Sequence, residues 1–585
     1  MYGGTMNRFA PIRRSSLLIF CFLMSGFSPG SSSLNEALPH AVCLTGESTA
    51  KTSIGLHRFY GEFRLAAGQV YESSGSMDVG DIVVLEASTQ NGILVPKNHF
   101  DLNSRSVEFI REDDGSYDVK VFAEELDQSA STFELEIPYN TSSTLDLGFN
   151  YSFFRKNYGK VRINSDGSLT FRRSSKVSPS AAGLDADLFG RLPRIAPLFS
   201  PFMFYPVAKV SVSQKQDRIT VTWRNTDLTQ AAQATLFQTG NIKFNYSGLP
   251  RATFGLTGIA SGKLREIPHF VDFTKSGPLQ GIQGTIAEVF QPGNGLDQAS
   301  IARNFLANHP DVFDMLIVFP GSKVFPRGEC TGCGVAYIYK NDIRGIGRSR
   351  YDYTKFFVKS RRFRQMTLQI GLEDYPVNPH EVISTFPVES NWSPLALVAH
   401  EVGHQWSSSV EIVENGIKTK NLLRDAAHWS FFTDTDGSYL GGNEIQDNGN
   451  GSFTTLAASQ GYSPLEQYLM GLRSSASVPP FFYVANATGA YPTDTPVSGI
   501  DLFGQRTDVT IEQVIDAEGP RIPDSTQSQH VFNLAFILIV PEGTKPVPSD
   551  LKKIERIRSE FPGFFRLAVE DRGRVNTSLN PQSQL

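Results

Sequence analysis

The stretch "SPLALVAHEVGHQW", from Ser393 to Trp406, contains two histidines four residues apart, and a glutamate directly follows the first. A serine followed by a proline is typical of a helix start, with Ser393 as the N-cap and Pro394 at the first helical position. Residues four apart lie on the same face of a helix, so His400 and His404 are expected to point the same way. The stretch therefore predicts a helix that presents two imidazoles side by side.

Two imidazoles on one helical face can each give a nitrogen to a single Zn²⁺ ion. Glu401 is rotated away from that face, so we expect it to contact a water in the open coordination position. Zinc lowers the pKa of such a water to about 7, and the carboxylate can then take its proton as general base. This pattern resembles the HExxH motif of the zincins, which are zinc metallopeptidases. We predict one zinc ion per chain at His400 and His404; a buried helix with hydrogen-bonded histidines is the alternative.

A catalytic zinc ion usually has a third protein ligand. The metzincin pattern places a glycine and a histidine soon after the motif, whereas this chain continues with "SSSV". We predict Glu466 of "GYSPLEQYLMGL" as the third ligand, because a carboxylate among apolar neighbours needs a partner; this layout resembles that of the gluzincins. Three alternatives stay open, the first being another carboxylate in place of Glu466, namely Asp425, Asp434 or Glu444. Ser463 and Glu466 fit a capping box, and His428 of "RDAAHWSFF" could be the third ligand or a transition-state stabiliser.

The N-terminus has the layout of a secretory signal. Arg13 and Arg14 precede an apolar run from Leu17 to Phe27, which gives way to "SPGSSS". The run of roughly 11 residues is shorter than the about 20 that a membrane span requires. We therefore predict a signal peptide over residues 1–33 and a secreted protein without a membrane span; a buried N-terminal helix is the alternative.

Three cysteines remain after the predicted signal peptide, namely Cys43, Cys330 and Cys333. The pair in "CTGC" is compatible with half of a zinc ribbon, but no second pair exists to complete four ligands. A redox dithiol is a further alternative. In an exported chain we expect a disulfide between Cys330 and Cys333, which leaves the state of Cys43 open.

The length of 585 residues suggests three or four domains, and the net charge of −5 gives no reason to expect a nucleic-acid partner. Alternating stretches such as "DIVVLEA" and "YDVKVFAEE" predict a small β-rich domain over residues 55–137. A stronger β pattern covers residues 138–275, with "INSDGSLTF" reading as strand, turn and strand.

Within 138–275, the segments "LGFNYSFF", "INSDGSLTF", "IAPLF", "ITVTWRN", "LFQTGNIKFNY" and "TGIASG" follow one another in the order found in nidogen-like (NIDO) domains. The region resembles that family. The resemblance implies a β-rich, β-sandwich-like extracellular module that binds a surface or matrix ligand and has no catalytic role.

Residues 276–585 have a mixed α/β pattern. "NGLDQASIARNFLANHPDVFDMLIVFPG" predicts a helix followed by a buried strand, and "SDLKKIERIRSEFPGFF" predicts a helix. Residues 310–575 resemble a group of exported proteins that share HExxH, "HWSFF", "YSPL" and "MGL" segments. We therefore expect a multidomain chain in which β-rich N-terminal domains precede an α/β (α+β) zincin-like metallopeptidase domain.

The function predicted from these observations is a secreted zinc endopeptidase that hydrolyses protein or peptide substrates. The alternative is an extracellular adhesion or binding protein with a vestigial metal site.

Overall fold

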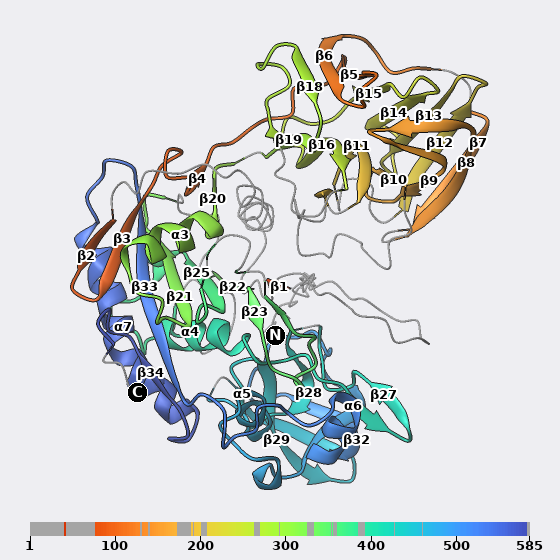
Figure 1. Cartoon of the computed structure of the whole chain (residues 1–585). Helices are drawn as coiled ribbons and strands as arrows, with labels where there is room; N and C mark the ends of the chain where they lie inside the picture. Colours follow the sequence, from red (N-terminus) through yellow and green to blue (C-terminus); the bar gives the residue numbers. More distant parts are fainter. Residues whose placement is uncertain are drawn as a thin grey trace, which may run out of the picture.

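The structure is a computed structural model that describes residues 40–41 and 76–581, except for short stretches within the longer range (129–130, 139–140, 172–188, 191, 201–206, 263–268, 292, 325–332, 353, 355–357, 359, 384–391, 426 and 459). The chain is β-rich, as predicted. Figure 1 shows the strands from β5 to β19 gathered in one part of the molecule and a second sheet, around β21 and β33, in another.

One mixed sheet forms the centre of the part that carries the HExxH segment. Its strand order is β1-β22-β25-β21-β33-β3-β2, and β34 pairs with β33. The strands β25, β21, β33 and β3 run parallel to one another, whereas β22 is antiparallel to β25. β21 is buried throughout, as expected for a parallel strand covered on both faces. The strands of this sheet are β1 (His40–Ala41), β2 (Ser76–Val79), β3 (Ile82–Ala87), β21 (Met315–Pro320), β22 (Cys333–Ile338), β25 (Gln365–Ile370), β33 (Val531–Pro541) and β34 (Arg574–Asn576).

Helices cover both faces of this sheet (Figure 1). α3 (Gln298–Asn308) shares a core with Val318 of β21. The next residue of the strand, Phe319, points to the opposite face and shares a core with α4 (Pro394–Gly403) and α7 (Pro548–Ala568). The HExxH helix α4 is therefore held between the sheet and α7.

The predicted separate β domain at 55–137 is not formed by the residues that the structure describes. β2 and β3 join the central sheet, where Val84 pairs with Leu538. β5 and β7, from the same stretch, pair instead with β15 and β12 of the following β region. The alternating pattern identified strands correctly but not their partners, because the partner of a strand can lie far along the chain.

The β region is consequently an insertion in the α/β part. β4 (Leu94–Val95) pairs with β20 (Gly295–Leu296) where the chain leaves the central sheet after β3 and returns to it before α3. The predicted boundaries at 138 and 276 therefore do not coincide with the observed change of sheet, which lies near β4 on one side and β20 on the other.

Two sheets form this inserted sandwich, with orders β17-β19-β16-β11-β10-β9-β8 and β18-β6-β5-β15-β14-β13-β12-β7. A core rich in aromatic rings lies between them, and the Trp223 indole donates a hydrogen bond to the Asn164 carbonyl across it (2.8 Å). The strands are β5 (Arg105–Arg111), β6 (Tyr117–Ala123), β7 (Phe133–Pro138), β8 (Ser142–Phe153), β9 (Lys156–Asn164), β10 (Leu169–Thr170), β11 (Pro193–Phe199), β12 (Val207–Gln214), β13 (Arg218–Arg224), β14 (Ala231–Phe237), β15 (Ile242–Ser247), β16 (Gly255–Ser261), β17 (His269–Phe270), β18 (Leu279–Ile282) and β19 (Ile286–Phe290).

Glu288 gives the sandwich a testable pH dependence. Burial raises the pKa of this carboxyl from 4.5 to about 8, although the Asn98 amide and the Phe273 N–H donate to its oxygens. Between these two pH values the folded state keeps a proton that the unfolded state has released. The free energy of unfolding should therefore fall as pH rises through this window, by at most about 1.4 kcal/mol per pH unit. Chemical denaturation at several pH values should show this slope. Glu288→Gln should reduce the slope, whereas the exposed control Glu112→Gln should leave it unchanged. A Glu288→Gln protein with the same slope as the Glu112→Gln control would contradict the assignment.

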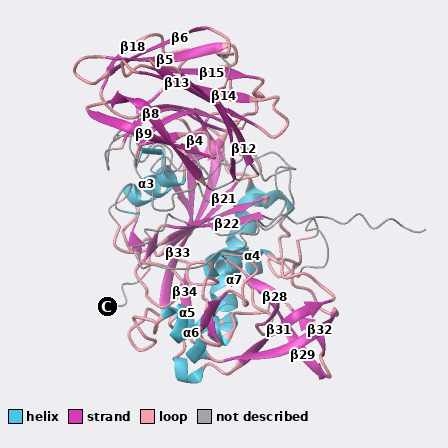
Figure 2. Ribbon diagram, turned by 90° about the vertical axis from the view of Figure 1, so that its right-hand side faces the viewer, coloured by secondary structure: helices cyan, strands magenta, loops and turns pink. Residues whose placement is uncertain are grey.

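A small closed barrel follows the HExxH helix, with strand order β28-β29-β30-β32-β31. Figure 2 shows it at the end of the molecule opposite the sandwich. "DNGNGS" forms the turn of the hairpin between β29 and β30. The elements of this part are β26 (Ile412–Glu414), β27 (Ile417–Thr419), β28 (Trp429–Asp434), β29 (Gly441–Gly449), β30 (Ser452–Ala457), α5 (Pro464–Met470), β31 (Phe481–Thr488), β32 (Asp501–Val509) and α6 (Ile511–Glu518).

No helix in the described ranges is long and apolar enough to cross a membrane. The apolar run that begins at Val531 is β33, which lies between β21 and β3 in the central sheet. The predicted signal peptide at 1–33, Cys43 and Cys330 lie outside the described residues, and so does the side chain of Cys333.

Candidate metal centre

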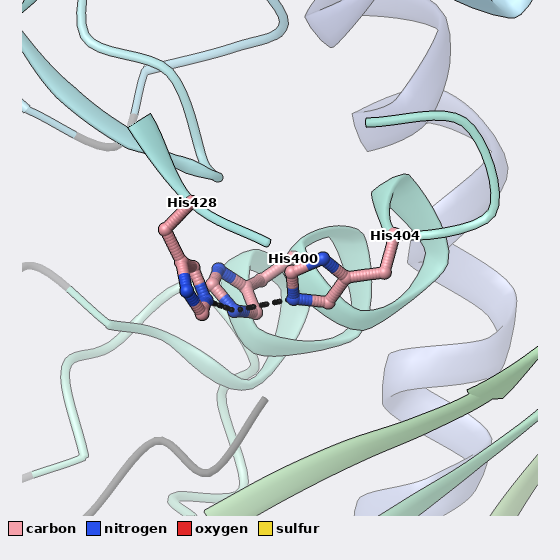
Figure 3. Close-up of side chains that lie close together, drawn as sticks. All are labelled: His400, His404 and His428. Carbon is pink, nitrogen blue, oxygen red and sulfur yellow. Dashed lines mark hydrogen bonds between the residues drawn. The ribbon is translucent and has the colours of Figure 1, made fainter. Parts of the chain in front are cut away.

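Three buried histidine rings converge on one point (Figure 3). His400 lies in the last turn of α4, His404 is the C-cap of this helix, and His428 directly precedes β28. His400 Nε2 lies 3.1 Å from His404 Nε2 and 3.4 Å from His428 Nε2, and all three ligand atoms lie within 4.8 Å of one another. Nitrogens about 2.0–2.1 Å from a tetrahedral zinc ion are roughly 3.3 Å apart, so these two Nε2–Nε2 separations fit such an ion.

The helix that carries the histidine pair begins as predicted. The Ser393 hydroxyl accepts a hydrogen bond from the Ala396 N–H (3.2 Å), and Pro394 occupies the first turn. Every residue of α4 is buried, and the Tyr462 hydroxyl donates to the Ala399 carbonyl (2.5 Å). The helix is therefore fixed by packing on all sides rather than by one amphipathic face.

A carboxylate places His428 beside this pair. Asp425 accepts hydrogen bonds from the N–H groups of Ala427 (2.7 Å) and His428 (2.9 Å), which tightens the turn before β28. The same carboxylate lies 2.9 and 3.0 Å from His428 Nδ1. Asp425 therefore holds both the main chain at His428 and the orientation of the His428 ring.

Hydrogen bonds at Nδ1 orient two of the rings. His400 Nδ1 lies 2.5 Å from the Tyr439 carbonyl, which can only accept, so this nitrogen carries the proton. The Asp425 carboxylate places the proton of His428 on Nδ1 in the same way. The Nε2 atoms of both rings then present lone pairs toward one another. Such an arrangement is unfavourable without a cation and is typical of metal-binding histidines with outer-shell partners.

The environment favours the metal-binding form of these side chains. Burial lowers the pKa of His400, of His404 and of His428, so the three rings are neutral near pH 7. Burial opposes ionisation of Asp425 as well, but the electrostatic interaction and hydrogen bond with the His428 ring, together with the nearby charge of Arg424, hold the pKa of that carboxyl well below its usual range. Neutral imidazoles bind metal without first releasing a proton.

Glu401 lies beside the histidine cluster, and its carboxylate oxygens accept no hydrogen bond from the described residues. Its Oε1 atom is 4.0 Å from His400 Nε2. Burial raises the pKa of this carboxyl well above its ordinary value. Its main chain is fixed, because Gln365 of β25 donates to the Glu401 carbonyl (2.7 Å). These are the properties expected of a general base.

Gly334 of β22 makes room for this carboxylate. A Cβ atom at position 334 would lie 2.2 Å from Glu401 Oε1 and 2.6 Å from Cγ. We expect Gly334→Ala to displace the Glu401 side chain while the histidines stay in place. The variant should bind zinc with unchanged affinity but lose most of any hydrolytic activity of the wild type. Unchanged activity would mean that Glu401 is not needed in its present position.

Glu466 is not part of the cluster, and its prediction as the third ligand is wrong in this structure. Its Oε2 atom accepts from the Ser463 N–H (2.6 Å), which completes the capping box of α5. Its Oε1 atom accepts from the Trp429 indole (2.8 Å) and the Ser438 hydroxyl (2.6 Å). A buried carboxylate did need partners, but three protein donors supply them, and the alternative ligand His428 lies beside the histidine pair.

Glu466→Gln tests this structural role. The glutamine amide keeps one acceptor oxygen, but its NH₂ group then faces groups that donated to the carboxylate, so at least one buried donor loses its acceptor. We therefore expect the free energy of unfolding to fall by about 1–3 kcal/mol. Zinc affinity should stay within a factor of a few. Glu512→Gln, at an exposed first-turn glutamate of α6, is the matched control and should be nearly neutral. Loss of zinc by the folded Glu466→Gln protein would restore Glu466 as a ligand.

Comparison with known proteins identifies one part of the chain. Residues 117–275 match the model of the NIDO-related family. This match confirms the predicted nidogen-like region, and its first residue is the first residue of β6. A domain of this kind suggests an extracellular protein. No curated protein and no solved structure matches the chain. The match covers well under half of the chain and does not include the histidine cluster.

Proposed function

We propose that this protein is a secreted, zinc-dependent endopeptidase. The observation that carries the proposal is the convergence of His400, His404 and His428 beside the buried carboxylate of Glu401. Three protein nitrogens leave one position of a tetrahedral ion open, which is typical of catalytic rather than structural zinc sites. The central sheet with α4 packed on it supports a zincin-like α/β domain for the site.

Each residue of the site has a distinct role in this proposal. The three histidines would hold the ion, and Asp425 keeps His428 in the tautomer that binds it. Zinc bound there would lower the pKa of a water and polarise the carbonyl of the scissile bond. Glu401 would take a proton from that water and return it to the leaving amine; the lack of a hydrogen-bond donor to its oxygens among the described residues supports this role.

The sandwich supports an extracellular setting for this chemistry. Its NIDO-related match suggests a binding role outside the cell, and its insertion between β3 and α3 ties it covalently at two points to the domain of the site. We propose that it binds an extracellular surface, matrix component or protein substrate and contributes no catalytic group.

Proteolysis by the purified full chain is the direct test. Casein and a mixed peptide library should be cleaved, a chelator should stop cleavage, and added zinc should restore it. A protein that holds zinc but cleaves neither substrate would favour the alternative of an extracellular binding protein with a vestigial metal site.

A further inference from the structure

Arg348 contacts the chain where the HExxH helix ends. Its Nη1 atom donates to the His404 carbonyl (2.6 Å), its Nη2 atom to the Ser407 carbonyl (3.2 Å) and its Nε atom to the Ser409 hydroxyl (2.8 Å). One guanidinium therefore spans the C-cap of α4 and the turn that follows it. The arginine comes from the segment between β22 and β25, far from this helix in the sequence.

His404 needs such support more than His400 does. His400 lies within α4, where the helical hydrogen bonds fix its main chain, whereas His404 is the C-cap, where the regular helix ends. A helix end leaves its last carbonyl groups without partners in the helix. Ligand atoms must nevertheless be held to within about 0.5 Å for a metal site to bind tightly. The His404 carbonyl therefore depends on a donor from outside the helix, and Arg348 supplies one.

We propose that Arg348 is a positioning residue of the metal centre, which holds His404 in the orientation that binds the ion. This inference rests on the proposed function, because it concerns the same site. The planar guanidinium can bond three acceptors in fixed directions, which an ammonium group cannot do. Its positive charge also lies favourably at a helix C-terminus. The same charge repels a nearby cation, so removal of Arg348 would strengthen zinc binding if charge outweighed positioning.

Zinc affinity of the full chain tests the proposal, measured by competition with a chromophoric chelator. We expect Arg348→Met to bind zinc about 10- to 100-fold more weakly, the range found when outer-shell partners of ligands are lost. Arg348→Lys should fall between this variant and the wild type. Arg344→Met, at an exposed arginine of the same segment, is the matched control and should bind like the wild type. Cobalt substitution gives a second readout, since a displaced His404 should change the visible absorption of a tetrahedral Co²⁺ site.

The outcomes separate this inference from the proposed function. Wild-type protein that binds no zinc would overturn the metal site and the inference with it. Wild-type protein that binds zinc while Arg348→Met binds it equally or more tightly would overturn the inference alone, even if the variant melts at a lower temperature. If Arg348→Met does not fold, Arg348→Lys decides, and wild-type affinity and cobalt absorption in that variant would overturn the proposal.

Discussion

Replacement of His428 by alanine is expected to release the metal while the central sheet stays folded. His428 supplies one of the three converging nitrogens, and its Nε2 atom lies 3.4 Å from that of His400. Loss of a direct ligand should weaken zinc binding by more than the roughly 10- to 100-fold that follows loss of an outer-shell partner. Equilibrium competition with a chelator measures this change, and circular dichroism checks the fold.

Two further variants make the result specific. Asp425→Asn keeps the imidazole but weakens the hydrogen bond at its Nδ1 atom, so its zinc affinity should lie between those of the wild type and His428→Ala. His380→Ala removes a half-exposed histidine that pairs with Glu560 on the surface, and it should leave zinc binding unchanged. Full zinc affinity in folded His428→Ala would show that another residue completes the site.

Glu401→Gln is expected to separate binding from chemistry. Glutamine has nearly the same shape, and Glu401 is not among the converging ligand atoms, so the variant should keep one zinc per chain. The glutamine cannot accept a proton from water. General acid–base catalysis typically contributes about 10²–10⁴-fold to a rate, so the rate of peptide hydrolysis should fall by at least this factor. The measurement is zinc content and the rate of casein cleavage on the same preparation. Undiminished cleavage would remove Glu401 from the mechanism.

The part of the site that lies on one helix could be predicted from the sequence. The start of α4, the shared face of His400 and His404 and the separate direction of Glu401 all follow from a single helix, and the structure has them. The third member could not be derived in this way, because His428 meets the pair only where the turn before β28 lies against α4 in the folded chain. A local signal was present, since Asp425 stands three residues before His428 and can bond its ring.

The misassignment of Glu466 has a related cause. Its apolar helical neighbours correctly indicated a buried carboxylate, but they do not show which donors reach it. The donors are Trp429 and Ser438, from β28 and the loop after it, together with the N-cap of its own helix. Burial could thus be predicted from the pattern around Glu466, whereas its partners depend on tertiary contacts.

The same distinction holds for the fold. The buried strand β21 and the helices α3 and α7 were recognisable from apolar runs and helical periodicity. The β-rich stretch at 55–137 was recognisable as strands, but its division between two sheets depends on pairing with β33 at one end and with β15 at the other. Alternation along a strand determines which side chains are buried and carries no information on which strand lies beside it.

The central claim is that three histidines hold one zinc ion, and X-ray absorption at the zinc edge tests it most directly. The full chain, purified without chelators and supplied with zinc, should contain about one ion per chain. Its spectrum should show three imidazole nitrogens and one oxygen from water at about 2.0–2.1 Å, and His428→Ala should lose one imidazole. A protein that binds no zinc, or a spectrum with two imidazoles that His428→Ala leaves unchanged, would contradict the account.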